Sequence, residues 1–148
     1  MNQKITLLQK KEIKELAEIF KESFSCSVYA EKWNTENSIK RITEVFEKNK
    51  EYCFVAKTDE QIIGAILCST YQHYNGKIGF IEELFISSKM QSKGLGTKLI
   101  EKAEQVFKQK GIIKTVLLAH TKASAFEFYK KKKYKENYFV QLEKDLIN

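Results

Sequence analysis

The segment at residues 80–100, FIEELFISSKMQSKGLGTKLI, constrains the fold most strongly, because a loop with two glycines joins an apolar run to a helical pattern. Gly94 and Gly96 are two of only six glycines in the chain, and apolar residues recur at helical spacing directly after them. Gly111 then stands where a C-cap glycine ends a helix, and a β-branched run follows at residues 113–120. This order of strand, helix and strand predicts a crossover between two parallel strands.

Apolar periodicity divides the rest of the chain into further strands and helices. Two helices are expected between the first two strands, and Thr35 can cap the second of them. Ser124 and Glu127 predict a capping box for a last helix. Further strands are predicted at residues 4–9, 51–57, 61–71, 77–87 and 138–146. The expected fold is therefore mixed α/β (α+β), with a mostly antiparallel sheet flanked by helices.

The amino-acid composition limits the classes of protein to which this chain can belong. The chain has no proline, no Gly/Ser-rich linker and no repeat, so we expect one domain over residues 1–148. At 43% hydrophobic and 30% charged residues it resembles a soluble globular protein. No window reaches the ~18 apolar residues of a membrane span, and the first residues lack a secretory signal. These patterns predict a cytoplasmic protein without a membrane partner.

The charged residues and cysteines narrow the classes further. The net charge of +7 comes from scattered lysines and from KKKKYK at residues 130–135, a pattern typical of a solvated face. No helix carries a continuous basic stripe, so we expect no nucleic-acid partner. An anion-binding surface protein that uses the KKKKYK segment is the remaining alternative based on positive charge. Cys26, Cys53 and Cys68 have neither disulfide-framework nor zinc spacing, so no metal is expected.

The glycine loop has the parts of an anion site. The first N–H groups of a helix lack intrahelical partners, and the macrodipole is positive there. Glycine lets those amides approach an oxygen, while polar side chains in the loop add donors. Two named phosphate motifs fail, because Thr97 stands where a Walker loop needs lysine and Leu99 where a dinucleotide fingerprint needs glycine. The alternative is a helix that simply begins after a glycine turn.

The loop Gln91-Ser92-Lys93-Gly94-Leu95-Gly96 resembles the Q/R-x-x-G-x-G/A signature of the GNAT superfamily of N-acetyltransferases. FIEELFIS is similar to the superfamily's central splayed strand, GIIKTVLLA to its next strand, and ASAFEFYKKKKY to its A-x-x-F-Y-x-K-x-G-F segment. EKWNTENSIKRI resembles acceptor-side helices in members related to aminoglycoside N-acetyltransferases. Two departures stand out: Lys122 replaces a common asparagine, and Lys133 replaces a common glycine.

The resemblance implies a splayed central parallel strand pair and acetyl-coenzyme A as acetyl donor. By this resemblance, the glycine loop binds the diphosphate of the coenzyme. A bulge in the strand at residues 82–87 leaves backbone amides unpaired, and these amides bind the pantetheine arm and the thioester oxygen. Glu82 matches an acidic residue that contacts the acceptor amine, as general base or amine anchor, and Tyr129 matches a tyrosine that protonates the coenzyme thiolate. The coenzyme-contacting residues implied are Leu84, Phe85, Ile86, Gln91, Ser92, Lys93, Gly94, Leu95, Gly96, Thr97, Lys122 and Phe128.

The acceptor pocket is expected from aromatic loop residues and from acidic residues suited to a cationic amine. Its candidates are Tyr29, Trp33, Tyr71, Tyr74 and Glu83. Adjacent residues of a strand point to opposite faces, so only one of Glu82 and Glu83 is expected to face the acceptor.

The function implied is direct acetyl transfer to a primary amine of a small molecule, such as an aminoglycoside-like or polyamine acceptor. A peptide or protein amine acetyltransferase and a non-catalytic coenzyme-binding sensor are the alternatives. A monomer or a homodimer fits the sequence equally well.

Overall fold

The computed structural model describes residues 2–26, 28–91 and 93–147. Within them the chain divides between Leu118 and Ala119 into two compact units, each described here by itself. The first unit holds all of the β-strands that the described residues form, and the second holds one helix, α4 (Ser124–Lys131).

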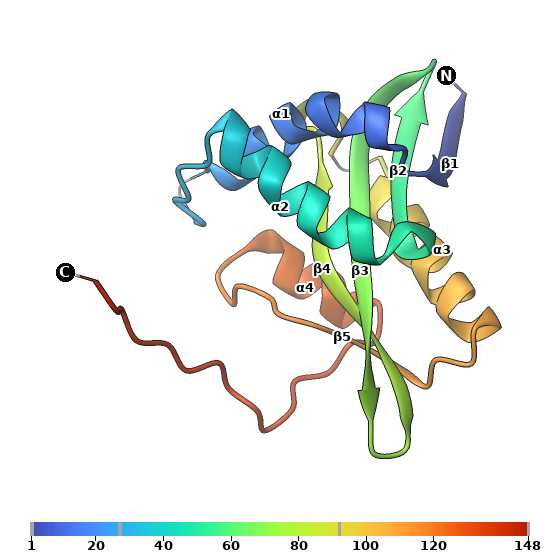
Figure 1. Cartoon of the computed structure of the whole chain (residues 1–148), viewed down its shortest axis with the longest axis vertical. Helices are drawn as coiled ribbons and strands as arrows, with labels where there is room; N and C mark the ends of the chain where they lie inside the picture. Colours follow the sequence, from blue (N-terminus) through green and yellow to red (C-terminus); the bar gives the residue numbers. More distant parts are fainter. Residues whose placement is uncertain (1, 27, 92, 148) are drawn as a thin grey trace. The chain divides into compact units, whose positions relative to one another are not determined.

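The first unit is built on one five-stranded sheet in the order β1-β2-β3-β4-β5 (Figure 1). Neighbouring strands run antiparallel except β4 and β5, which are parallel. The strands are β1 (Gln3–Leu7), β2 (Cys53–Thr58), β3 (Gln61–His73), β4 (Gly76–Ile86) and β5 (Lys114–Leu117). This arrangement confirms the predicted mixed, mostly antiparallel fold class.

Three α-helices cover the sheet: α1 (Ile13–Phe24), α2 (Thr35–Lys48) and α3 (Leu95–Gln109). Figure 1 shows α1 and α2 in front of the sheet and α3 behind it. Short 3-10 helices, η1 (Lys10–Glu12), η2 (Lys50–Tyr52) and η3 (Ser88–Met90), join these elements. The helix α3 therefore connects the two parallel strands as the crossover that the sequence predicts.

Each face of the sheet has its own packing. On the face of α1 and α2, fully buried Phe20 and Ile42 join Leu67 and other strand residues in one apolar cluster. On the face of α3, a Cβ atom at Gly79 would lie 2.5 Å from the Phe107 ring. The glycine at position 79 thus lets α3 approach β4 closely.

The first residue of two helices differs from the prediction. The cap of α2 is Asn34, whose side chain accepts a 2.7 Å hydrogen bond from the Asn37 N–H, while Thr35 donates to Glu18 on α1 instead. The helix α4 begins at Ser124 itself, so no side-chain cap and no capping box form. Both predictions were wrong by one position, because a local sequence pattern locates the end of a helix only to within one or two residues.

The strand predicted at residues 138–146 is also wrong. The described part of the chain has no strand after β5, and the apolar residues of this segment are exposed. The alternation of side chains is a local property, but a strand also needs a neighbour for its backbone hydrogen bonds.

The helix α3 ends as predicted, at a glycine in the left-handed region. Gly111 has a φ of 74°, and its N–H donates to Lys108 O at 3.1 Å. The next N–H, of Ile112, donates to Phe107 O at 2.9 Å. This pair of bonds is a Schellman motif, which uses two carbonyls that the helix end leaves without partners.

The helix α4 ends in the same motif without a glycine. The Lys133 N–H donates to Lys130 O at 3.0 Å and the Tyr134 N–H to Tyr129 O at 3.1 Å. Lys133 has a φ of 73°, which favours glycine over residues with a Cβ atom. The helix end therefore keeps the turn but places Lys133 in a strained conformation.

Candidate active site

A β-bulge in β4 places two carboxylates side by side. In the pairing of β3 with β4, Leu67 lies opposite Glu83 and Cys68 lies opposite Ile81, so Glu82 is the extra residue. A bulge turns two consecutive side chains toward the same side of the sheet. The expectation that Glu82 and Glu83 point to opposite faces was wrong for this reason.

Arg41 of α2 holds both carboxylates. Its Nη2 donates to Glu82 Oε1 at 2.9 Å and to Glu83 Oε2 at 3.3 Å, and its Nε lies 3.4 Å from the same Glu83 oxygen. Ser69 Oγ on β3 donates to the other oxygen of Glu82 at 2.6 Å. The guanidinium and the carboxylates are mostly covered, with side chains 25%, 25% and 17% exposed for Arg41, Glu82 and Glu83.

The surroundings of Glu83 raise its pKa from 4.5 to about 7. Burial is the main cause, because it disfavours the charged form, and the negative charges of Glu31 and Glu82 act in the same direction. Arg41 opposes the shift, but its guanidinium is shared among three carboxylates, those of Glu82, Glu83 and Glu44. Glu83 therefore changes its charge near neutral pH, where a general base is most effective.

Two predicted acceptor residues, Tyr29 and Trp33, lie in the segment between α1 and α2. The Tyr29 ring packs edge-on against Phe24 at 5.1 Å, and burial, followed by nearby negative groups that include Glu83, raises the pKa of its phenol. Trp33 packs against Phe20 at 4.8 Å, and its Nε1 donates to Glu31 Oε1 at 2.9 Å. Tyr29 therefore lies near Glu83, and Trp33 is linked to Glu83 only through Glu31, whose charge also acts on that carboxylate.

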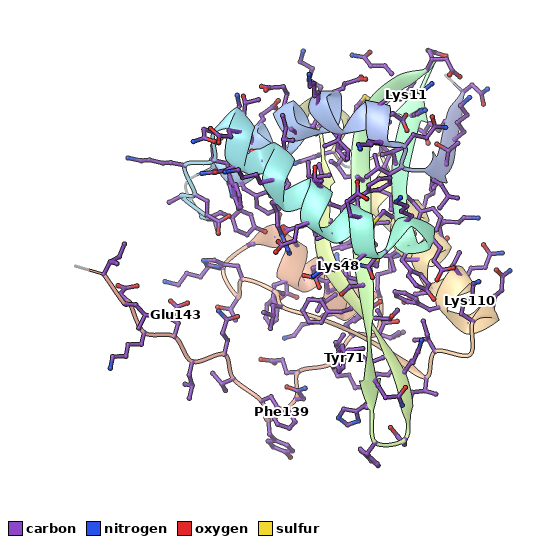
Figure 2. All side chains as sticks on the ribbon, in the orientation of Figure 1. Lys11, Lys48, Tyr71, Lys110, Phe139 and Glu143 are labelled. Carbon is purple, nitrogen blue, oxygen red and sulfur yellow. The ribbon has the colours of Figure 1, made fainter. Side chains whose placement is uncertain are left out.

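The other two predicted acceptor residues lie elsewhere in the first unit. Tyr71 and Tyr74 are at the β3–β4 hairpin, where both rings contact His73, and they are 44% and 90% exposed. Figure 2 labels Tyr71 on this hairpin. Tyr71 is three residues beyond Cys68 along β3, or roughly 10 Å at strand spacing. The structure thus does not bring these tyrosines together with Tyr29 and Trp33.

The parallel strands β4 and β5 separate beside the carboxylates. Their pairing ends at Ile81 and Leu117, whereas β4 continues to Ile86. From residue 82 onward, the side of β4 that faces away from β3 therefore has no strand partner among the described residues. This is the splay that the sequence predicts.

The three predicted amides of β4 differ in direction. The Ser87 N–H donates to Ile63 O on β3 at 2.8 Å. Because N–H groups alternate in an antiparallel ladder, the Phe85 amide also points to β3, and those of Leu84 and Ile86 point to the open side. The Leu84 and Ile86 amides thus have no partner on β3, while the buried Phe85 ring packs against α1.

The loop after β4 leads to the N-terminus of α3. Gly94 is the N-cap, with a φ of 78° and no heavy atom within 4 Å of a built Cβ, so its conformation rather than crowding within the protein explains the glycine. Buried Leu95 anchors the first turn, which also contains Gly96 and Thr97. The Lys98 N–H is the first to bond within the helix, to Gly94 O at 3.2 Å. The preceding amides are the donors that an anion requires.

The side chains of the loop lie at its surface. Gln91 is exposed and its Nε2 lies 3.4 Å from Ile86 O, and Lys93 is exposed as well. Ser92, also predicted to bind the coenzyme, lies outside the described residues.

The second unit holds the remaining three predicted residues. The Lys122 N–H donates to His120 Nδ1 at 3.0 Å, just before α4. The rings of Phe128 and Tyr129 are 5.5 Å apart on α4, and Lys132 lies over the Phe128 ring at 5.9 Å.

Across residues 2–26, 28–91 and 93–147, no group of three or more His, Cys, Asp or Glu side chains could hold a metal ion. In the same residues, no helix is long and apolar enough to cross a membrane.

Sequence reasoning missed Arg41, Ser69 and Glu31. Arg41 follows the helical period of α2 onto the flank of its apolar face, beside Ile42. A guanidinium so close to that face is a signal that could have suggested a buried partner, since such charges are rarely covered without one.

Known proteins resemble this chain in sequence and in fold. The model of the acetyltransferase (GNAT) family matches residues 13–134. An uncharacterized N-acetyltransferase of Chlorobaculum tepidum is 31% identical over 106 residues, which cover 70% of this chain and 64% of that protein. N-alpha-acetyltransferase 30 of Xenopus laevis is 39% identical over 54 residues, 36% of this chain and 20% of that protein. The chain thus spans less than two-thirds of the length of these relatives.

Solved structures show the same fold. A protein of Pyrococcus horikoshii superposes with a TM-score of 0.80 at 23% identity, covering 95% of this chain and 93% of that one. An aminoglycoside acetyltransferase from an uncultured soil metagenomic sample superposes with a TM-score of 0.73 at 22% identity, covering 98% and 97%. With the family match over residues 13–134, these findings show that the chain belongs to the acetyltransferase (GNAT) family.

Proposed function

We propose that the chain is an acetyl-coenzyme A-dependent N-acetyltransferase that transfers the acetyl group directly to a primary amine of a small molecule. The observation that carries the proposal is the separation of β4 from β5 after Ile81 and Leu117. It leaves backbone donors on β4 next to the carboxylates and upstream of the α3 N-terminus. One continuous segment thus offers donors for both ends of a coenzyme.

The coenzyme would lie along this segment. The amides of Gly96 and its neighbours at the start of α3 would bind the diphosphate, with Lys93 adding positive charge at the surface. The Leu84 and Ile86 amides would bind the pantetheine arm and the thioester oxygen, where fixed donors are most effective. When bound, the coenzyme supplies an activated acetyl group.

The acceptor amine would meet the carboxylates on the α2 side of β4. An amine is cationic at neutral pH and must lose a proton before it can attack a carbonyl. Glu82 is the proposed general base or amine anchor, through direct or water-mediated contact. Tyr129 is the proposed acid for the departing thiolate, since a phenol with an ordinary pKa of ~10 holds its proton at neutral pH.

The acceptor class has two candidates. An aminoglycoside-like or polyamine acceptor is favoured by the acidic pair and by structural similarity to an aminoglycoside acetyltransferase. A peptide or protein amine is the second candidate, because part of the chain is similar to N-alpha-acetyltransferase 30.

Thermal unfolding with and without acetyl-coenzyme A tests the donor site. At ~100 times Kd, a ligand that binds only the folded state adds about 2.7 kcal/mol. For a domain of this size that is roughly 5 to 10 °C in Tm. Gly94→Leu should abolish the shift, whereas the matched control Gly111→Leu, with a similar φ at the other end of α3, should keep it. Absence of any shift in the unaltered chain would contradict the proposal.

A non-catalytic coenzyme sensor is the remaining alternative. Glu82→Gln and Tyr129→Phe separate the two functions, because a sensor needs neither group for binding. If both variants keep the acetyl-coenzyme A shift and release thiol more slowly than the unaltered chain at an amine concentration below KM, the enzyme is supported. If the unaltered chain binds the coenzyme and releases no thiol with any amine, the sensor is favoured.

A further inference from the structure

Glu82 and Glu83 share Arg41 but differ in their remaining contacts. Glu82 is engaged at both oxygens, by Arg41 Nη2 at 2.9 Å and by Ser69 Oγ at 2.6 Å. Glu83 contacts Arg41 through Oε2 only, at 3.3 and 3.4 Å. Among the residues that the structure describes, none donates a hydrogen bond to Glu83 Oε1. One carboxylate is thus fixed, and the other has an oxygen available.

We propose that Arg41 is a positioning residue that gives the two carboxylates different roles. Glu82 anchors the acceptor ammonium, and Glu83 is the base that removes a proton from it. This inference rests on the proposed acetyltransferase function. It assigns the base to Glu83 instead of Glu82.

The charges around Glu83 agree with this assignment. Glu82 on the same strand, and Glu31 and Tyr29 from the segment between α1 and α2, face it along with Arg41. Burial and the two acidic neighbours raise the pKa of Glu83 to about 7 in spite of Arg41. A carboxylate in such a setting is ionised in part of the molecules at neutral pH and holds a proton well once it has received it.

The proton transfer balances without any further reactant. An N–H bond of the acceptor ammonium breaks, its electron pair stays on nitrogen, and the proton bonds to Glu83 Oε1. Glu83 becomes a neutral acid, and the amine becomes a neutral nucleophile. Glu82 keeps its negative charge and its contacts with Arg41 and Ser69, so the anchor stays in place during the transfer.

The charge balance also indicates the acceptor class. Arg41 contacts Glu44 at 3.4 Å in addition to Glu82 and Glu83, and the charge of Glu31 also acts on Glu83. One guanidinium thus faces several carboxylates, so this group of side chains keeps a net negative charge when the carboxylates are ionised. We therefore expect a cationic acceptor, with its reacting ammonium recognised by Glu82 and Glu83.

The test combines the titration of carboxylates with enzyme kinetics on the full chain. The signal that Glu83→Gln removes from a carboxylate 13C NMR titration should move near pH 7, and Arg41→Gln should shift it to higher pH. Thiol release is measured with spermidine, kanamycin and a short peptide with a free amino terminus, and the amine acetylated fastest is used for the pH profile. Glu83→Gln should lower kcat about 10²- to 10⁴-fold and remove the acidic limb of the profile.

The other variants separate positioning from base chemistry. Glu82→Gln should raise KM and keep the acidic limb. Arg41→Gln should move that limb to higher pH, and Arg41→Lys should restore it partly, because lysine returns the charge without the planar fork. Glu36→Gln, an exposed change on α2, is the matched control and should alter neither kcat nor KM.

Each failure has a distinct signature. A Glu83 signal that titrates near pH 4.5, or an acidic limb that Glu82→Gln removes and Glu83→Gln preserves, overturns the inference and leaves the acetyltransferase function standing. A chain that acetyl-coenzyme A does not stabilise contradicts the proposed function itself, and the inference falls with it.

Discussion

Gly111 and Lys133 occupy the same position of the same motif, at the ends of α3 and α4, with φ values of 74° and 73°. Both complete a Schellman motif, yet only one of them is the residue that the left-handed region favours. The difference has a measurable consequence for stability.

Lys133→Gly should stabilise the chain by up to ~1 kcal/mol, because it removes the strain of a Cβ atom at positive φ. The greater entropy of glycine in the unfolded chain offsets part of this gain. The reverse change at the matched position, Gly111→Ala, should destabilise it by about 1 kcal/mol. Urea unfolding of both variants measures the two effects. A Lys133→Gly variant that is less stable than the unaltered chain would show that the lysine side chain has a compensating role.

Glu83 should make stability depend on pH. Its pKa is raised from 4.5 to about 7, so between these values the folded state holds a proton that the unfolded chain has released. Stability should therefore fall as pH rises from about 5 to 7, by on the order of 3 kcal/mol. Glu83→Gln mimics the protonated form, so it should be more stable than the unaltered chain at pH 8 and equal to it near pH 4.5. Equal stability of the two proteins at pH 8 would contradict the raised pKa.

Gly79 should not tolerate a side chain. A Cβ atom there would lie 2.5 Å from the Phe107 ring, so Gly79→Ala should cost ~1–3 kcal/mol through overpacking. In a double-mutant cycle, Phe107→Leu should recover part of that loss by making room. Additive effects of the two changes would show that the contact is not the cause.

The three cysteines should differ in reactivity. Cys26 is exposed, and burial raises the pKa of Cys53 to about 11 and that of Cys68 well above its ordinary value. Because the thiolate is the reactive form, a thiol reagent should modify one cysteine rapidly in the native protein and three after unfolding. Cys26→Ser should remove the rapid phase, which also clears the background of thiol-release assays. A rapid phase that survives this change would mean that a strand thiol is accessible.

Asn34 should contribute more to the stability of α2 than Thr35 does. Asn34→Ala removes the side-chain cap and should cost ~1 kcal/mol. Thr35→Ala removes only exposed contacts with Glu18 and Lys21, so its cost should stay below ~0.5 kcal/mol. Comparison of the two variants by denaturant unfolding checks the assignment, and a larger effect at Thr35 would reverse it.

Most local features of the fold could be predicted from the order of the residues. Apolar periodicity located α1, α2, α3 and the five strands, and Gly94 and Gly111 marked the start and the end of α3. These signals are local because capping, left-handed turns and amphipathic faces depend on a few neighbouring residues. The order of strand, glycine loop, helix and strand also limited the fold to a parallel crossover.

The assembly of the candidate site, in contrast, depends on contacts between distant segments of the chain. The bulge at Glu82 exists only in the pairing of β4 with β3 and cannot be read from either strand alone. Its register turns both carboxylates toward Arg41, which is 41 residues away from Glu82 in the sequence. The dependence of a strand on pairing also explains why residues 138–146 form no strand, although their alternating apolar residues predicted one. Pairing, register and burial arise between segments that are distant in the chain, so local patterns leave them undetermined.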